Sequence, residues 1–195
     1  GAEQHGHMEA VGYDLYCKLL NEAVLALKGE TEEGAEFETT VDCDIDAYIP
    51  ASYIKNEYQK LDIYKRISGI ESEEEYMDMQ DELIDRFGEI PGPVENLLRV
   101  AALKALAHRA GVTDVFINRQ EVRLVMFKKA EIDVTGIPEL IGKYRGDLKL
   151  RPGDAPEFLY QDQRSRNKDC MKMTEKAKEL LTELCSLCER AREGA

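Results

Sequence analysis

The fold is decided by residues 72–93, which read SEEEYMDMQDELIDRFGEIPGP. Ser72, followed three residues later by Glu75, forms a capping box, in which side chains satisfy backbone N–H groups at the start of a helix. Apolar residues then recur at helical spacing, at Tyr76, Met79, Leu83 and Phe87. This spacing predicts a helix that begins after Ser72 and buries one face.

The end of this stretch predicts a turn into a second helix. Gly88 can adopt the left-handed conformation that ends a helix, and Pro91 cannot continue one. Pro93 suits the first residue of the next helix, which we expect to continue to Gly111. Its apolar residues are expected on one side of the helix, at Val94, Leu97, Leu98, Ala101, Ala105 and Leu106.

The first of these helices is strongly acidic. Between residues 71 and 85 there are eight acidic residues and no basic one, and Arg86 follows directly. Four of the acids recur at steps of three or four residues and form one stripe, called here the acidic stripe: Glu75, Asp78, Glu82 and Asp85. The stripe is either solvated surface or a docking surface for a basic partner. Arg86 is placed to fold back onto Glu82.

Composition limits the function classes. The chain of 195 residues has a net charge of −13, which makes it a poor nonspecific DNA binder, because phosphate contacts need Lys and Arg. No apolar run approaches the roughly 20 residues that span a membrane. The five cysteines form no framework pattern, so we expect free thiols in a reducing cytoplasm. The chain begins with Gly1 rather than Met, and we expect it to be part of a longer protein.

The sequence contains no complete metal site or catalytic constellation. His5 with His7 and Cys185 with Cys188 lack further ligands nearby. The series of aspartates at 42, 44 and 46 lacks the Gly and Glu that a calcium loop needs at its sixth and twelfth positions. We find no phosphate-binding loop and no recognisable nucleophile–base arrangement. We therefore expect no metal, no cofactor and no catalytic residue in this chain.

The remaining elements follow from periodicity. A half-buried strand is expected at 41–49, and a helix near 58–68 should turn Leu61, Tyr64 and Ile67 to the core. The last helix, 168–192, could pack on the core or on another chain. Further elements are expected as follows: a helix at 13–29, an acidic linker at 30–36, a hairpin of strands 114–118 and 122–127, a helix at 136–144, and strands at 148–151 and 157–160. The fold class is α+β, with a small, mainly antiparallel sheet, several helices and an N-terminal helical appendage.

Four segments carry a family resemblance. They read QHGHMEAVGYDLY (4–16), AYIPASYI (47–54), LDIYKRI (61–67) and ELIDRFGEIP (82–91). In order and spacing they resemble the C-terminal part of bacterial transcription-repair coupling factors. The resemblance implies a parent protein that is a large ATP-driven DNA translocase, which displaces stalled RNA polymerase and recruits the damage-recognition subunit of excision repair.

The resemblance also implies a division of the chain. Residues 1–29 would be the tail of the second motor domain, with Gln4 and Gly6 as the remnant of its translocation motif. After the linker at 30–36, residues 37–195 would form the C-terminal regulatory domain. In the family this domain clamps the repair-binding module near the N-terminus and hides its docking surface until the motor engages polymerase.

The motif match carries the acidic residues of this polar contact onto Glu82 and Asp85, which lie in the acidic stripe. Glu75, Asp78 and Arg86 are the further candidate docking residues. We expect reversal of Glu82 and Asp85 to Lys to leave the helix folded, because apolar neighbours hold it. The alternative is a motor accessory that contacts DNA or polymerase through basic residues at Arg164, Arg166, Lys168 and Lys172. The acidic charge balance favours the regulatory domain.

Overall fold

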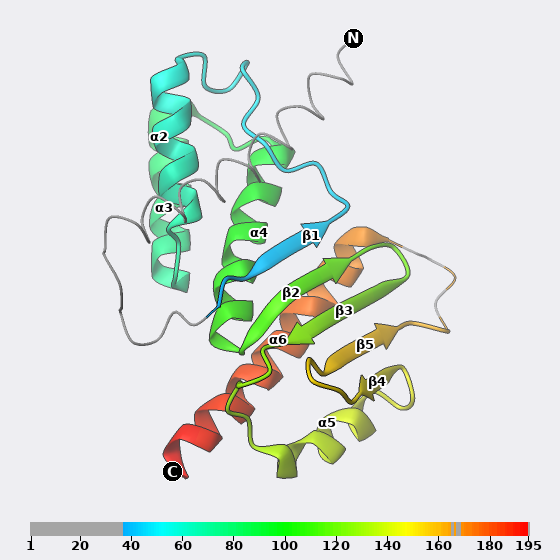
Figure 1. The fold of residues 1–195 in the computed structure, drawn as a ribbon. Coiled ribbons are helices and arrows are strands. Elements are labelled where there is room, and N and C mark those ends of the chain that lie inside the picture. Colours follow the sequence, from blue (N-terminus) through cyan, green and yellow to red (C-terminus); the bar gives the residue numbers. More distant parts are fainter. Residues whose placement is uncertain (1–36, 165, 167–168, 195) are drawn as a thin grey trace. The chain divides into compact units, whose positions relative to one another are not determined.

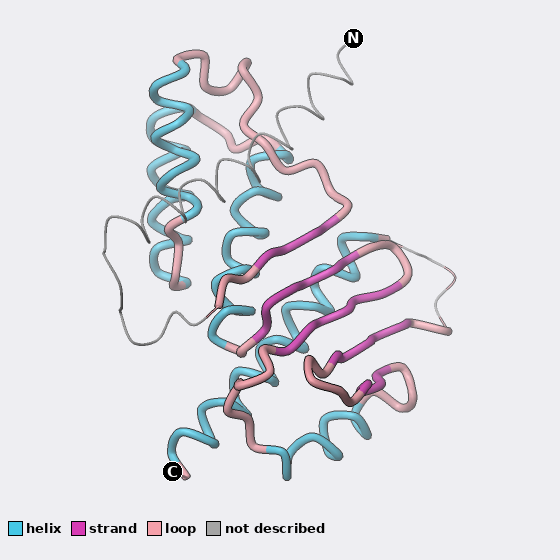
Figure 2. The backbone as a smooth tube through the Cα atoms, in the orientation of Figure 1, coloured by secondary structure: helices cyan, strands magenta, loops and turns pink. Residues whose placement is uncertain are grey.

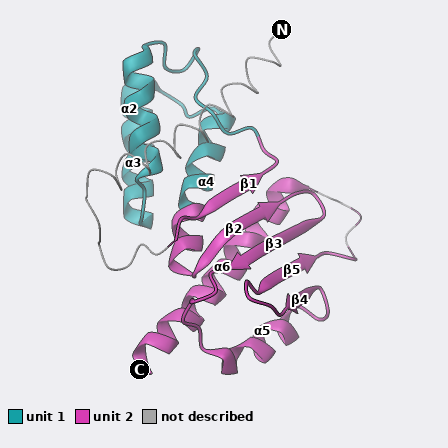
Figure 3. Cartoon of the chain, in the orientation of Figure 1, with its two compact units in different colours: residues 1–36, 46–102 teal, residues 37–45, 103–195 magenta. Residues whose placement is uncertain are grey.

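The computed structural model describes residues 37–164, 166 and 169–194 (Figure 1). The predictions for the motor remnant with Gln4 and Gly6, for the helix at 13–29 and for the linker at 30–36 lie outside these residues, as does Lys168. The described chain divides into two compact units (Figure 3). Asp46–Ala102 belongs to unit 1, whereas Phe37–Ile45 and Leu103–Ala195 form unit 2.

Unit 1 contains helix α2 (Glu57–Ser68), helix α3 (Glu73–Phe87) and the first part of helix α4 (Gly92–Arg109). Its core collects apolar residues from all three helices and from the segment before α2: Ile49, Ile54, Ile63, Tyr64, Ile67, Met79, Leu83, Val94, Leu97 and Leu98. The predicted core side of α2 is wrong at Leu61, which is 45% exposed. The neighbouring positions 60, 63, 64 and 67 also fit a helical period, and packing buries that face instead.

The predicted start of α3 is confirmed, with one difference in its cap. The Ser72 hydroxyl accepts from the backbone N–H of Glu75 at 3.2 Å. The Glu75 carboxylate accepts from the N–H of Glu71 at 2.8 Å, instead of from that of Ser72 as a capping box requires. Helix α3 ends at Phe87, and the capping residue Gly88 that follows has a φ of 88°, which favours glycine.

Helix α4 begins one residue earlier than predicted, at Gly92, because the Pro91 carbonyl accepts from the N–H groups of Val94 and Glu95. The sequence predicts that the apolar residues of α4 line one side of the helix, but the structure buries two different sides. The first part is buried in unit 1 through Leu97 and Leu98 and other residues, whereas Leu103 and Ala107 are buried in unit 2. Ala105 and Leu106 are only half-buried, because a helix that serves two cores changes its buried face along its length.

Unit 2 is built on a five-stranded sheet in the order β1-β2-β3-β5-β4 (Figures 1 and 2). Its strands are β1 (Thr40–Cys43), β2 (Val112–Ile117), β3 (Glu121–Met126), β4 (Leu148–Arg151) and β5 (Glu157–Gln161). Only β1 and β2 pair in parallel, so the prediction of an α+β fold with a mainly antiparallel sheet is confirmed. The predicted hairpin is β2–β3, and the side chain of Asn118 accepts two N–H groups in its turn.

The predicted strand at 41–49 is too long, since β1 ends at Cys43. The alternation continues beyond it because the chain passes from unit 2 into unit 1, where Ile49 is fully buried. The alternating apolar residues therefore belong to two separate cores, although in the sequence they look like one continuous strand.

Helix α6 (Cys170–Glu193) lies along one face of the sheet (Figure 1). Its apolar side is buried in the core of unit 2, at Ala177, Leu180, Leu181, Leu184 and Leu187. This resolves the alternative that the sequence left open, because the apolar side of α6 packs on the core. A short 3-10 turn (Val134–Gly136) and α5 (Ile137–Lys143) precede β4. Among the described residues, no helix is both long and apolar enough to cross a membrane.

Candidate docking surface

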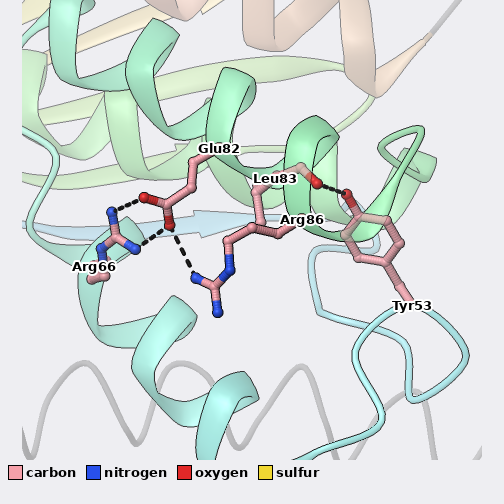
Figure 4. Close-up of polar contacts among 5 residues, drawn as sticks. All are labelled: Tyr53, Arg66, Glu82, Leu83 and Arg86. Carbon is pink, nitrogen blue, oxygen red and sulfur yellow. Dashed lines mark hydrogen bonds and ion pairs between the residues drawn. The ribbon is translucent and has the colours of Figure 1, made fainter.

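Helix α3 is held in unit 1 by its buried face and by hydrogen bonds. Tyr76 and Gln80 each donate to Glu95 of α4 at 3.0 Å. Burial, reinforced by the Glu95 carboxylate, raises the pKa of Tyr76 to about 12, so its hydroxyl remains a donor at neutral pH. The hydroxyl of Tyr53 donates to the backbone carbonyl of Leu83 in α3 at 3.1 Å (Figure 4). It also donates to the carbonyl of Gly88, just after α3, at 2.9 Å. The outer side chains of α3 therefore project from a fixed helix.

Glu82 is engaged by two arginines of its own chain (Figure 4). Both terminal nitrogens of Arg66 in α2 donate hydrogen bonds to the Glu82 carboxylate. Nη2 donates to Oε1 at 2.7 Å, and Nη1 donates to Oε2. Arg86 donates to Oε2 at 3.2 Å, which confirms the predicted fold-back of Arg86. The Arg66 hydrogen bonds, with those of Arg86, hold the pKa of Glu82 below its ordinary value of 4.5.

The acidic stripe thus separates into engaged and open carboxylates. Glu75 and Glu82 both accept hydrogen bonds from their own unit. Asp78 and Asp85 are exposed, and neither forms an ion pair with another residue that the structure describes. The four acids of the stripe lie on one side of α3, but Asp78 and Asp85 are the ones that present unneutralised charge.

Arg66 is a site residue that sequence reasoning missed. Arg66 lies on α2, 16 residues before Glu82 on α3, so no local spacing pattern in the sequence joins the two. The only signal in the sequence is that Arg66 belongs to the LDIYKRI segment. A bidentate pair of this geometry is the strongest type of surface ion pair, and it links α2 to α3.

A change of Glu82 to Gln should make unfolding less sensitive to acid. The pKa of Glu82 is lowered in the folded state, so its stabilisation is present above about pH 4.5 and is lost as pH falls through the folded pKa. We expect Glu82→Gln to lower the free energy of unfolding at pH 7 by about 1 kcal/mol or less. The difference from the parent chain should shrink towards pH 3 in urea unfolding experiments.

The control for this experiment is Asp81→Asn, which changes an exposed acid in the middle of the same helix. It should leave the free energy of unfolding at pH 7 nearly unchanged, since Asp81 has no ion pair with a described residue. Equal losses in the two variants at pH 7 would show that the Arg66–Glu82 pair contributes nothing to stability.

Of the basic residues in the alternative interpretation, Arg164, Arg166 and Lys172 are described, and acidic residues lie near Arg164 and Lys172. Arg164 and Arg166 are exposed, and the backbone N–H of Arg164 donates to the carboxylate of Asp162. Lys172 lies in the first turn of α6, in a groove whose lining residues carry both charges. Acidic neighbours in that groove include Asp162, Asp169, Glu175 and Glu179.

Cys185 and Cys188 serve packing within unit 2. Their thiols donate to the carbonyls of Leu106 and Ala110, both at 3.4 Å, and so join α6 to the end of α4. Burial raises the pKa of both thiols above the ordinary value of 9.0. Across the residues that can be described, no three His, Cys, Asp or Glu side chains converge in a way that could hold a metal ion.

Known proteins are similar to this chain in sequence and fold. The TRCF domain model matches residues 43–137, from the end of β1 through α2, α3, α4 and the β2–β3 hairpin. A curated transcription-repair-coupling factor from Bacillus subtilis is 42% identical over 136 residues, which are 70% of this chain and 12% of the relative. The corresponding protein of Staphylococcus epidermidis is 39% identical over 137 residues, with the same shares. The chain thus spans about an eighth of these relatives.

A solved structure agrees with the sequence matches. A crystal structure of the C-terminal domain of transcription-repair coupling factor superposes with a TM-score of 0.62 at 27% identity. The match covers 79% of this chain and 96% of the solved one. The chain therefore belongs to the transcription-repair-coupling factor family and carries the C-terminal domain of that family.

Proposed function

We propose that this chain is a noncatalytic regulatory domain that docks on the repair-binding module near the N-terminus of its own parent protein. Docking masks the surface with which that module binds the damage-recognition subunit of excision repair. The parent protein is an ATP-driven DNA translocase that acts on stalled RNA polymerase, and engagement of polymerase releases the domain. Family membership and the acidic face of α3 support this proposal.

The observation that carries the proposal is the pair of open carboxylates on α3. Asp78 and Asp85 lie seven residues apart, about 10 Å along the helix axis, on a helix whose position is fixed by its packing. Charges held in place before binding lose less entropy on association than mobile charges do. A basic surface on the repair-binding module would complement them and steer the encounter.

The other predicted docking residues have supporting roles in this proposal. Glu82, bound by Arg66 and Arg86, joins α2 to α3 and keeps the side of α3 that carries Asp78 and Asp85 in place. Glu75 fixes the start of the helix through the N–H of Glu71. Glu75 and Glu82 therefore position α3, and in this proposal they lie at the rim of the contact.

The proposal predicts salt-sensitive binding between the chain and the isolated repair-binding module. Calorimetry at about 50 mM and about 300 mM salt should show binding that weakens at the higher salt, because exposed charges are screened. Absence of binding at the lower salt, or binding that salt does not change, would contradict docking through exposed carboxylates.

A titration with duplex DNA separates this function from the alternative. We expect weak binding, given the net charge of −13 and the mixed charges around Lys172. Tight binding with a steep salt dependence would instead support a motor accessory that contacts DNA through Arg164, Arg166, Lys168 and Lys172.

A further inference from the structure

Helix α3 carries a second exposed face that the docking residues do not use. Glu74, Met77, Asp81 and Ile84 follow one another at steps of three, four and three residues, so they form one ridge along the helix, called here the outer ridge. All four are exposed, Met77 at 56% and Ile84 at 54%. Acidic and apolar side chains alternate along it.

The apolar residues of the outer ridge have no role in the core of unit 1. The buried face of α3 is formed by Met79 and Leu83, which are at most 4% exposed. Ile84 lies about 100° round the helix from Leu83, given 3.6 residues per turn. A solvated helix face favours Glu, Lys or Ala, and a β-branched Ile there has a lower helix propensity.

Large exposed hydrophobic residues are few in the described part of the chain. The others are Tyr58 and Leu61 on α2 and Val134 before α5. Met77 and Ile84 differ from them in their setting, because they lie in the segment where eight acids occur without a base. A binding partner for this ridge must therefore supply both apolar contacts and positive charge.

We propose that the outer ridge binds a basic amphipathic helix of a partner. Met77 and Ile84 lie two turns apart, about 10 Å along the axis, which matches apolar residues at i and i+7 of a helix that runs alongside. A Lys or Arg between those apolar residues would meet Asp81, and a further one beyond the residue that contacts Met77 would meet Glu74. Asp78 and Asp85 add negative potential beside the ridge.

This site goes beyond the proposed docking function and does not depend on it. None of the four ridge residues is a docking residue for the repair-binding module. The apolar ridge residues Met77 and Ile84 lie about 80–120° round α3 from Asp78 and Asp85, whereas Glu74 and Asp81 lie next to the acidic stripe. Substitution of Met77 and Ile84 therefore leaves the stripe unchanged. The two surfaces can therefore be tested by separate substitutions.

The test uses the full chain and a labelled model peptide of Leu and Lys, with Leu at helical spacing so that it forms a basic amphipathic helix. Fluorescence anisotropy at low salt should show that it binds more tightly than a scrambled peptide of the same composition. The double variant Met77→Gln/Ile84→Gln should weaken this binding about tenfold or more, because both apolar anchors are lost. Gln is a good helix former, so circular dichroism should remain unchanged.

The matched control is Tyr58→Gln/Leu61→Gln, which removes two exposed apolar side chains from α2. It should leave peptide affinity unchanged. Equal binding of the two peptides, equal binding by the ridge variant, or an equal loss in the control would overturn the proposal. So would sedimentation that shows a dimer of the parent chain abolished by the ridge substitutions, since the occupant would then be a second copy.

Discussion

Replacing Asp78 and Asp85 together by Lys should weaken docking on the repair-binding module by about 30-fold or more and leave the domain folded. Loss of one member of a partly buried charged pair across an interface costs about 2–5 kcal/mol, much of it from the partner charge that is left unpaired. Both residues are exposed in the domain, so their substitution removes no core contact. Calorimetry with the isolated module measures the effect, and circular dichroism checks the fold.

The matched control is Glu131→Lys/Asp154→Lys, which makes the same change in net charge at two exposed acids of unit 2. It should lower affinity only slightly, through the general field of the protein. If the two double variants lost affinity equally, docking would depend on net charge, and the positions of Asp78 and Asp85 would be irrelevant. If neither lost affinity, the acidic stripe would be solvated surface.

Glu82 is a poor choice for such a test, although the sequence points to it. Its reversal to Lys would bring three cationic side chains together, because Arg66 and Arg86 both bind the present carboxylate. The expectation that the helix tolerates this reversal considered only the apolar neighbours on α3. The ion pairs that link α2 to α3 make reversal a change of stability as well as of surface charge.

Leu83→Ala should lower the free energy of unfolding of unit 1 by about 2–5 kcal/mol. Leu83 is fully buried in the core of this unit, and removal of its outer carbons leaves a cavity. Urea unfolding followed by circular dichroism measures the loss. Docking should survive wherever unit 1 remains folded, because Asp78 and Asp85 keep their places on α3.

The adjacent substitution Ile84→Ala serves as the control. Ile84 is 54% exposed, and Ala has a high helix propensity. The free energy of unfolding of unit 1 should therefore change by less than about 0.5 kcal/mol in this variant. A cost of Leu83→Ala no larger than that of Ile84→Ala would contradict the assignment of the buried face of α3.

Local signals in the sequence predicted the elements that local interactions determine. The cap at Ser72 marks the start of α3, and the two β-propensity runs on either side of Asn118 mark the β2–β3 hairpin. Both depend on residues within a few positions of one another. The fold class follows from the same elements, since short antiparallel strands and separate helices leave few other arrangements.

Features set by contacts between distant segments were not predictable in the same way. The Arg66–Glu82 pair joins two helices, and no spacing rule relates them. The buried face of α4 changes because its first part belongs to the core of unit 1 and its last part to the core of unit 2, which a single helical period cannot represent. On α2, both Leu61 and Ile63 fit a helical spacing with Tyr64 and Ile67, and packing against the rest of unit 1 buries Ile63 and leaves Leu61 exposed.

The most direct measurement is the affinity of the full-length parent protein for the damage-recognition subunit, with and without Asp78→Lys/Asp85→Lys. A masked module binds only in the fraction of molecules that are open, so release of the domain should raise the apparent affinity by the inverse of that fraction. We predict tighter binding by the variant in the absence of RNA polymerase. Unchanged affinity, in a folded variant whose isolated domain no longer docks, would contradict masking by this domain.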